Sequence, residues 1–205
     1  MGMKKSKEKV FKQKVRKTSI WVKLLLPLIL VIALLCVLLG LFSYNTLEEE
    51  MVAMGQSQAL TVATLAEAQL DSSVVAEITQ PGLEGSESYL SQQEILIEIQ
   101  EKGNVLYIYT LFTDGEKVYY GIDADTTETA CAIGEEFKYS YEELASVFNG
   151  EAYVEEEIDN SDGEALLTTY VPVTAEDGTV VAVLGCDYDA SEILYELKDS
   201  QNKTL

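Results

Sequence analysis

The sequence predicts an α+β protein with an N-terminal transmembrane helix, a long membrane-proximal helix and one compact module built on a five-stranded antiparallel sheet. Three features predict this architecture: an uncharged apolar run near the N-terminus, opposite net charges on its two sides, and short strand patterns separated by Asp-Gly pairs. The expected segments are a basic tail (1–19), the membrane helix (20–43), the long helix (44–80), the module (81–190) and a C-terminal helix leading back to the membrane (191–205).

The apolar run from Leu24 to Phe42 has 19 residues without a charge. As a helix it is roughly 28 Å long, close to the thickness of a hydrocarbon core. Pro27 lies in its first turn, where a missing hydrogen bond matters least. A cleaved signal peptide would have a shorter apolar region, typically about 7–15 residues, and a small-x-small site, which Leu41–Asn45 does not offer. The run therefore predicts an uncleaved membrane anchor.

Charge divides the chain at this run. Residues 1–23 carry nine Lys/Arg and one acid, a net charge of +8, whereas residues 43–205 carry five basic residues and 34 acids, a net charge of −29. The positive-inside rule places the basic end in the cytoplasm and residues 43–205 outside. The acidic body argues against nucleic acid, and the absence of His excludes Ser-His-Asp or Cys-His catalysis and His-ligated metals. We therefore expect no enzyme, no cofactor and no nucleic-acid partner.

The segment Thr46–Thr79 has no proline and predicts the long helix, with Thr46 and Glu49 as a capping box and Gln80-Pro81-Gly82 as its end. Polar residues weaken the seven-residue stripe along it, so we expect no stable coiled coil from it alone. One side of the helix is expected to face the module and the other a partner helix. The stripe comprises Leu47, Met51, Met54, Gln58, Thr61, Leu65, Ala68, Ser72 and Val75.

The module begins with a helix predicted over Ser86–Lys102, although Glu94–Ile99 within it also alternates like a strand. Asp-Gly pairs and strand-like alternation then predict hairpins, and a capping box at Ser140 and Glu143 predicts a short helix after the second strand. A last helix begins at Ser191. This order is typical of a PAS-like sensor module. The predicted strands are Val105–Thr113, Glu116–Asp123, Ala152–Ile158, Ala165–Val173 and Thr179–Tyr188.

Two stretches resemble Cache sensor domains. Val105–Asp125 looks like their first hairpin, and Tyr170–Ala190 resembles their ending, P-x5-G-x6-G-x-D. Helix-anchored Cache domains of this kind are similar to the input halves of methyl-accepting chemotaxis proteins. The resemblance therefore implies a homodimeric, extracytoplasmic small-molecule sensor for chemotaxis, which is single-pass in the sequence as given. Such proteins usually continue into a second span and an output domain, whereas this sequence stops at Leu205, as a fragment or as a receptor without output.

The resemblance also implies a ligand site on the face of the sheet. Asp187 matches the Asp at the end of the family's last strand, which pairs with the ligand amine in amino-acid-binding members; alternatively, it caps the final helix or the turn at Asp189-Ala190. The family's carboxylate-clamping Arg-x-Trp-Tyr motif is absent, because the only Arg is Arg16 and the only Trp is Trp21. A neutral or amine-bearing ligand is therefore expected, rather than a dicarboxylate.

Strand tyrosines are further candidates for ligand contacts, through their hydroxyls and ring faces. Ordinary cross-strand packing is the alternative for each of them. By strand parity Tyr119 and Asp123 fall on one face, so we expect them to act together. The candidate tyrosines are Tyr107, Tyr109, Tyr119 and Tyr170.

Metal and disulfide signals are weaker. Asp123-x-Asp125 and Asp159–Glu164 gather oxygen ligands, but they lack the spacing of an EF-hand loop, and we predict no metal. Cys131 and Cys186 are either a disulfide pair or two free thiols. For the whole protein, the alternatives to a chemoreceptor are the input domain of a sensor kinase or nucleotide cyclase, and a membrane-tethered interaction protein without a small ligand.

Overall fold

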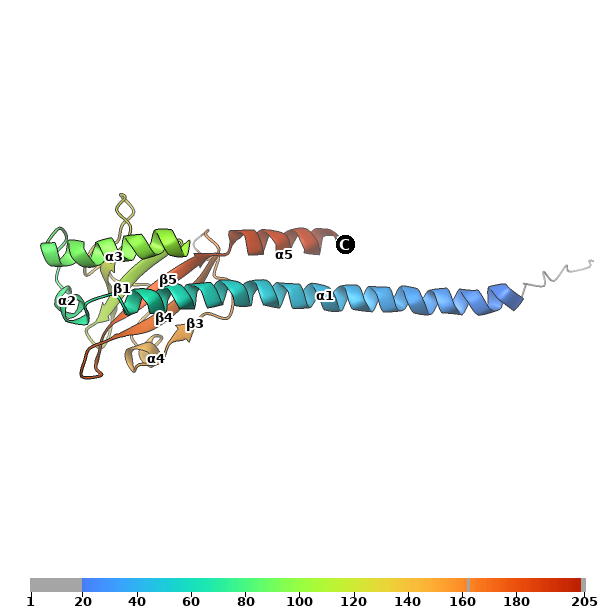
Figure 1. The fold of residues 1–205 in the computed structure, drawn as a ribbon, viewed down its shortest axis with the longest axis horizontal. Helices are drawn as coiled ribbons and strands as arrows, with labels where there is room; N and C mark the ends of the chain where they lie inside the picture. Colours follow the sequence, from blue (N-terminus) through green and yellow to red (C-terminus); the bar gives the residue numbers. More distant parts are fainter. Residues whose placement is uncertain (1–19, 162, 204–205) are drawn as a thin grey trace, which may run out of the picture. The chain divides into compact units, whose positions relative to one another are not determined.

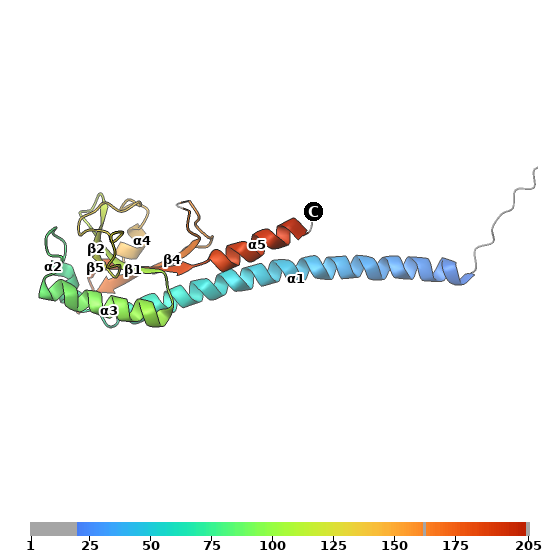
Figure 2. The same cartoon turned by 90° about the horizontal axis from the view of Figure 1, so that it is seen from above.

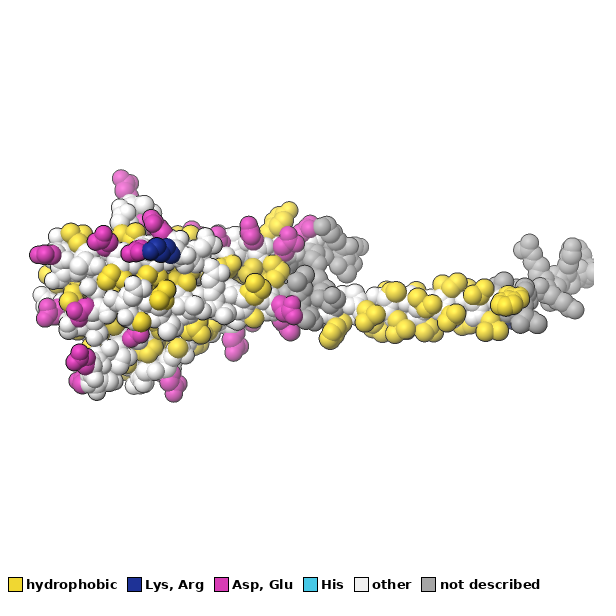
Figure 3. Space-filling model, viewed as in Figure 1, with side chains coloured by type: hydrophobic (Ala, Val, Ile, Leu, Met, Phe, Trp, Pro, Cys, Tyr) yellow, Lys and Arg dark blue, Asp and Glu magenta, His cyan; other side chains and the backbone are white. Residues whose placement is uncertain are grey.

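A computed structural model describes residues 20–161 and 163–203. The chain divides into two compact units, Met1–Asn45 and Thr46–Leu205. Figure 1 shows their helices and strands. The expected basic tail, 1–19, lies outside the described residues. In the first unit the apolar side chains of Lys23–Phe42 are exposed, and this segment is long and apolar enough to cross a membrane (Figure 3). The observed α+β class and five-stranded antiparallel sheet confirm the predicted fold class.

Helix α1 (Ile20–Glu67) differs from the expected long helix at both ends. Its backbone is helical through Thr46, so no helix begins at the predicted capping box there. It stops at Glu67 instead of Thr79: the Gln69 N–H bonds to the Ala66 carbonyl at 3.0 Å in a closing turn, and a second helix, α2 (Ser72–Glu77), then begins with its own N-cap. The carboxylate of Asp71 accepts hydrogen bonds from the N–H groups of Ser73 and Val74 at 3.0 and 3.4 Å.

Helix α3 (Glu87–Gly103) confirms the helix predicted after the Pro-Gly segment, and the strand alternative for Glu94–Ile99 is wrong. The hydroxyl of Ser86 caps it by accepting from the Tyr89 N–H at 3.2 Å, and Asn104 ends it in the left-handed conformation. The last helix, α5 (Ser191–Lys203), begins where it was predicted.

The sheet has the order β2-β1-β5-β4-β3, with all neighbours antiparallel. Asp-Gly turns close the β1–β2 and β4–β5 hairpins, and Gly115 and Gly178 have the positive φ that such turns require. Strand β3 is shorter than predicted, and the short helix α4 (Ala145–Phe148) lies in the insertion before it. The strands are β1 (Tyr107–Thr113), β2 (Val118–Asp123), β3 (Tyr153–Val154), β4 (Leu166–Thr174) and β5 (Val180–Asp189).

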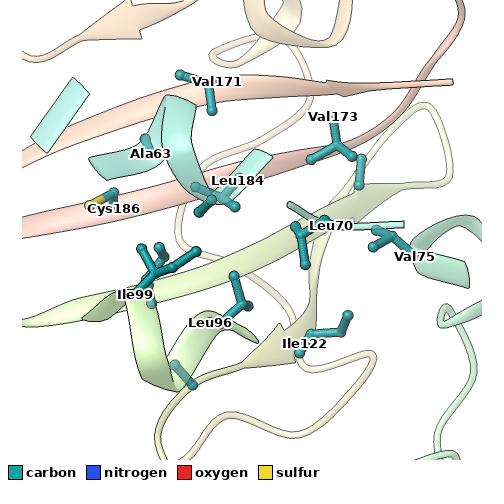
Figure 4. Packing of buried hydrophobic residues seen from close by; sticks show 14 of the residues in the cluster. Ala63, Leu70, Val75, Leu96, Ile99, Ile122, Val171, Val173, Leu184 and Cys186 are labelled. Carbon is teal, nitrogen blue, oxygen red and sulfur yellow. The ribbon is translucent and has the colours of Figure 1, made fainter. Parts of the chain in front are cut away.

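Two different cores lie on the two faces of this sheet. On one face, here called the helix face, α3 and the C-terminal part of α1 pack against β1, β4 and β5 (Figure 2). Its buried side chains are mostly aliphatic, with Leu96, Ile99 and Leu184 at its centre (Figure 4). Gly55 allows α1 to approach closely, since a Cβ there would lie 2.9 Å from Leu167 Cδ1.

The opposite face, here called the cavity face, is largely aromatic. Rings from three strands and from the segment before α4 meet edge to face, as for Tyr120 and Phe137, whose centroids are 5.1 Å apart. The insertion between β2 and β3 covers this face (Figure 2). The aromatic residues in contact are Tyr109, Tyr120, Phe137, Tyr139 and Tyr170.

Candidate ligand-binding site

A cavity of about 170 Å³ opens on the cavity face, between the first two strands, β5 and the loop that follows β2. Polar and aromatic side chains converge on it, which is typical of a small-ligand site. Four of the six predicted site residues line it: Asp187, Tyr107, Tyr109 and Asp123. The complete lining is Tyr107, Tyr109, Tyr120, Asp123, Asp125, Thr129, Cys131 and Asp187.

A β-bulge in β2 decides which side chains reach the cavity. Tyr109 pairs with Asp123, but Leu111 pairs with Tyr120, so β2 carries one extra residue between these two pairs. The bulge sits at Gly121, where the Thr110 hydroxyl fills the space of a side chain and accepts from the Ile122 N–H at 2.7 Å. The parity prediction is therefore wrong: Tyr120, and not Tyr119, shares the face of Asp123.

Asp187 is held by its neighbours on both sides in the sheet. It pairs with Tyr107 on β1 and with Thr168 on β4, and its Oδ1 accepts from the Tyr109 hydroxyl at 3.4 Å. Only 6 % of the residue is exposed, and this burial raises the pKa of its carboxyl to about 7. The helix-cap alternative is wrong, because Asp189 accepts the Ser191 N–H at the start of α5.

Asp123 fastens the loop that covers the cavity. Its two carboxylate oxygens accept from the N–H groups of Asp125 and Cys131, each at 2.9 Å. Burial nevertheless raises the pKa of Asp123. Asp125 in turn accepts from Thr127 and Thr129, and these bonds lower its pKa. At the β2 side of the cavity there are thus two carboxyl groups: the pKa of Asp123 is raised and the pKa of Asp125 is lowered.

The predicted tyrosines have four different environments. The Tyr107 hydroxyl donates to Glu164 Oε1 at 3.1 Å, and the Tyr109 ring lies over Gly185, where a Cβ would approach it to 2.5 Å. Tyr170 is fully buried beneath the aromatic cluster and does not line the cavity. Tyr119 lies outside the site, where its hydroxyl donates to Asp114 Oδ2 at 2.8 Å in the hairpin turn.

Sequence reasoning missed Tyr120, Asp125, Thr129 and Cys131 as cavity residues, and considered Asp125 only as an oxygen ligand for a metal. Only Tyr120 had a local signal, because a glycine inside a strand, here Gly121, suggests a bulge. The two cysteines are free thiols, and the disulfide alternative is wrong in this structure. Cys186 is buried on the helix face, whereas Cys131 lies at the cavity, where burial raises its pKa to about 11.

No lysine or arginine lines the cavity among the described residues. The module's described lysines pair elsewhere: Lys102 with Glu98, Lys117 with Glu136 and Lys138 with Asp159. Within the same part of the chain, no three His, Cys, Asp or Glu side chains are placed to hold a metal ion. The arrangement therefore suits a ligand that donates hydrogen bonds or carries positive charge.

No protein-family model matches the chain, and a search of curated proteins finds no match. Solved structures do match. The E. coli DcuS sensor domain is 19% identical with a TM-score of 0.51, covering 73% of this chain and 98% of that domain. The fold is that of a Cache/PAS-like sensor domain.

Two further sensor domains are similar to this Cache/PAS-like module. The V. cholerae histidine kinase DctB sensor domain is 12% identical with a TM-score of 0.53, covering 75% of this chain and 58% of that one. The ligand-binding domain of Campylobacter jejuni chemoreceptor Tlp3, in complex with L-valine, is 15% identical with a TM-score of 0.40, covering 74% and 62%. The chain thus spans about three fifths of the length of both.

Proposed function

We propose that residues 46–205 are the extracytoplasmic input domain of a membrane-anchored sensor, which binds a small molecule in the cavity and is not an enzyme. The observation that carries this proposal is the nearly buried Asp187, placed at a cavity with three tyrosine rings on the sheet of a Cache/PAS-like fold. A carboxylate this poorly solvated is costly without a partner, so a ligand group that pairs with it gains affinity.

The proposed ligand is neutral or bears an amine. Asp187 accepts hydrogen bonds from it, Asp123 adds negative charge, and the rings of Tyr107 and Tyr109 contact its apolar part. Tyr170 supports the site from below, packing among the same aromatic side chains as Tyr109. Because no basic side chain lines the cavity among the described residues, a dicarboxylate would have no charge partner there.

A ligand screen on the full chain in detergent tests the proposal. A ligand at 100 times its dissociation constant stabilises a single-site protein by about 2.7 kcal/mol, which we expect as a rise in melting temperature. Asp187→Asn should abolish most of that rise, while the exposed control Glu142→Gln should keep it. If no compound in a broad library of amines and neutral molecules stabilises the chain, it is a tethered interaction protein instead.

We also propose that the N-terminus is cytoplasmic and the module outside. The charge asymmetry supports this orientation, with +8 before the apolar run and −29 after it. A reporter that needs the cytoplasm should be active when fused at residue 1 and inactive when fused after Leu205. Activity at the C-terminal fusion would refute both the orientation and the extracytoplasmic sensor.

The output is proposed to be of chemoreceptor type, as the methyl-accepting resemblance implies. The input of a sensor kinase is the second candidate, since the DctB sensor domain has the higher structural similarity of the two named output types. Fusing residues 1–205 to each kind of output and measuring its ligand response distinguishes them. A response only from the kinase fusion would overturn the chemoreceptor assignment.

A homodimer through α1 completes the proposal. Met54 and Leu65 of the heptad stripe are 73 % and 53 % exposed, so a partner helix has access to them. Ser72 lies beyond the end of α1, and the side chain of Leu47 is outside the described part. In a Cys36→Ala background in membranes, cysteine at Met54 or Leu65 should cross-link and cysteine at the surface residue Glu157 should not. The opposite pattern would place the interface elsewhere.

A further inference from the structure

The cavity face holds all the buried acidic residues among those that the structure describes. Asp123, Asp187 and Glu155 are 6, 6 and 8 % exposed, whereas the helix face buries no acid. Carboxylates are rarely this buried without a charge partner. The charge of Lys138 lowers the pKa of Asp187 and of Glu155, but its ammonium pairs with Asp159 at 2.8 Å and lies 5.0 Å from the centroid of the Tyr139 ring.

A second buried carboxyl group on the cavity face, Glu155, has an oxygen without a hydrogen-bond donor. The hydroxyl of Tyr139 donates to Glu155 Oε1 at 3.2 Å, but the buried Glu155 Oε2, which can only accept, has no partner. Glu155 lies on the same face of the sheet as Asp187 but two strands away, because its N–H bonds to the carbonyl of Thr168 and Thr168 pairs with Asp187. A group that only donates, such as an ammonium, suits these surroundings.

Acidic groups stand at both sides of the cavity. Asp187 pairs with Tyr107 on one side of β1. On the other side, the bond from Ala124 N–H to the Ile108 carbonyl, 3.1 Å, continues the register and places Asp125 opposite Tyr107. Adjacent strands are about 4.8 Å apart, so the Cα atoms of the two aspartates are about 10 Å apart.

We propose that the cavity binds a short aliphatic diamine, an organic cation with two amino groups and no carboxylate. One ammonium pairs with Asp187, and the other pairs with Asp125 and Asp123. A hydrogen bond of about 2.8 Å at each end can slant above the line that joins the two carboxylates, which leaves roughly 5 to 6 Å between the two nitrogens and room for a chain of about three to four carbons. The rings of Tyr107, Tyr109 and Tyr120 line the space between, where they favour cations and alkyl groups.

This inference rests on the proposed sensor function and narrows its ligand. An amino acid would bring its carboxylate to the aspartates at one side of the cavity, with no basic residue to receive it. A monoamine would leave one acidic side unpaired. The strongly acidic module favours approach of a cation in either case, so only a comparison of matched ligands separates these classes.

Isothermal titration calorimetry on the full chain in detergent provides that comparison, using 1,4-diaminobutane, n-butylamine and 4-aminobutanoate. All three share one amine and a four-carbon chain and differ only at the other end. The diamine should bind at least tenfold more tightly than butylamine, and 4-aminobutanoate more weakly than butylamine. Because this comparison uses the unaltered chain, it does not depend on how any variant folds.

Variants then locate the two ammonium groups. Asp187→Asn and Asp125→Asn should each weaken diamine binding at least tenfold, whereas only one of them should weaken butylamine, which needs a single carboxylate. The control Glu128→Gln removes one exposed charge from the same loop without touching the cavity lining, and should change affinity less than twofold.

The outcomes separate the inference from the proposed function. Binding of 4-aminobutanoate as tight as that of the diamine would overturn the diamine and leave an amine-binding sensor. If only neutral compounds bind, the diamine inference is also wrong, but the proposed sensor function stands. If the screen finds no small ligand of any kind, the sensor function itself fails, and the diamine fails with it.

Discussion

The two faces of the same sheet are built for different tasks, and β5 shows the contrast within one strand. Ala182, Leu184 and Cys186 point to the helix face, where aliphatic side chains are fully enclosed. The alternating positions, including Gly185 and Asp187, face the aromatic side and the cavity. A period of two thus assigns adjacent residues of one strand to stability or to ligand contact.

The difference between the two faces indicates which one contains groups that lower the stability of the folded module. The helix face has no buried acid among the described residues, whereas the cavity face has three, and Glu155 Oε2 among them has no hydrogen-bond partner. Buried polar groups without partners cost free energy in the folded state, and proteins retain such costs chiefly at functional sites. Substitutions on the helix face should therefore destabilise the fold, whereas neutralising acids on the cavity face should stabilise it while abolishing binding.

The largest expected effect is on the helix face. Leu184→Ala removes a side chain with no exposed surface and should lower the free energy of unfolding by about 3 kcal/mol, since such substitutions cost roughly 2–5 kcal/mol. Urea denaturation followed by circular dichroism measures the loss. The control Leu90→Ala removes the same atoms from a half-exposed position of α3 and should cost about 0.5 kcal/mol or less. Equal losses would mean that the helix face is not the main core.

The second effect is of opposite sign and depends on pH. The pKa of Asp187 is raised to about 7 in the folded state, so between about pH 4 and 7 the folded chain holds a proton that the unfolded chain has released. The free energy of unfolding should therefore fall as pH rises through this window, by on the order of 2 kcal/mol. Asp187→Asn should reduce this slope and be more stable than the parent at pH 8.

Glu155 and Asp123 also have raised pKa values, so part of the slope should persist in that variant. The measurement is a series of melting temperatures from pH 4 to 8 for both chains. The parent's stability could instead be independent of pH, or change with pH as much as that of Asp187→Asn. Either result would show that Asp187 is not a buried acid with a raised pKa.

The third effect concerns the bulge that brings β2 to the cavity. Gly121→Ala would place a Cβ 2.7 Å from Thr110 Oγ1, so the strand must shift, at a cost of about 1–3 kcal/mol. The shift should also turn Asp123 from the cavity and weaken ligand binding. Melting temperature and ligand titration measure the two consequences. A variant as stable as the parent, with unchanged binding, would show that the bulge is not needed for the site.

The sequence predicts a feature of this molecule correctly when the residues that determine it lie close together along the chain. Local chemistry predicted the α3 cap at Ser86 and the Asp-Gly hairpins, because each is decided within a few residues. The end of α1 was missed because no proline or glycine marks it: a short turn after Glu67 separates α1 from α2, whose own cap is Asp71. The site was half predicted: the family ending marked Asp187, but its burial depends on Thr168 and Tyr109, which are distant in sequence.

The smallest effects compare the two neighbouring tyrosines of β2. The Tyr119 hydroxyl donates to Asp114 at the surface, so Tyr119→Phe should change stability by about 0.5 kcal/mol or less and leave ligand affinity unchanged. Tyr120→Phe removes a hydroxyl at the cavity and should weaken ligand binding severalfold at similar stability. Strand parity without the bulge predicts the reverse, so ligand titrations of this pair decide which residue of β2 faces the ligand. Because both variants lose only one oxygen from adjacent positions, a difference between them is an effect of strand face rather than of composition.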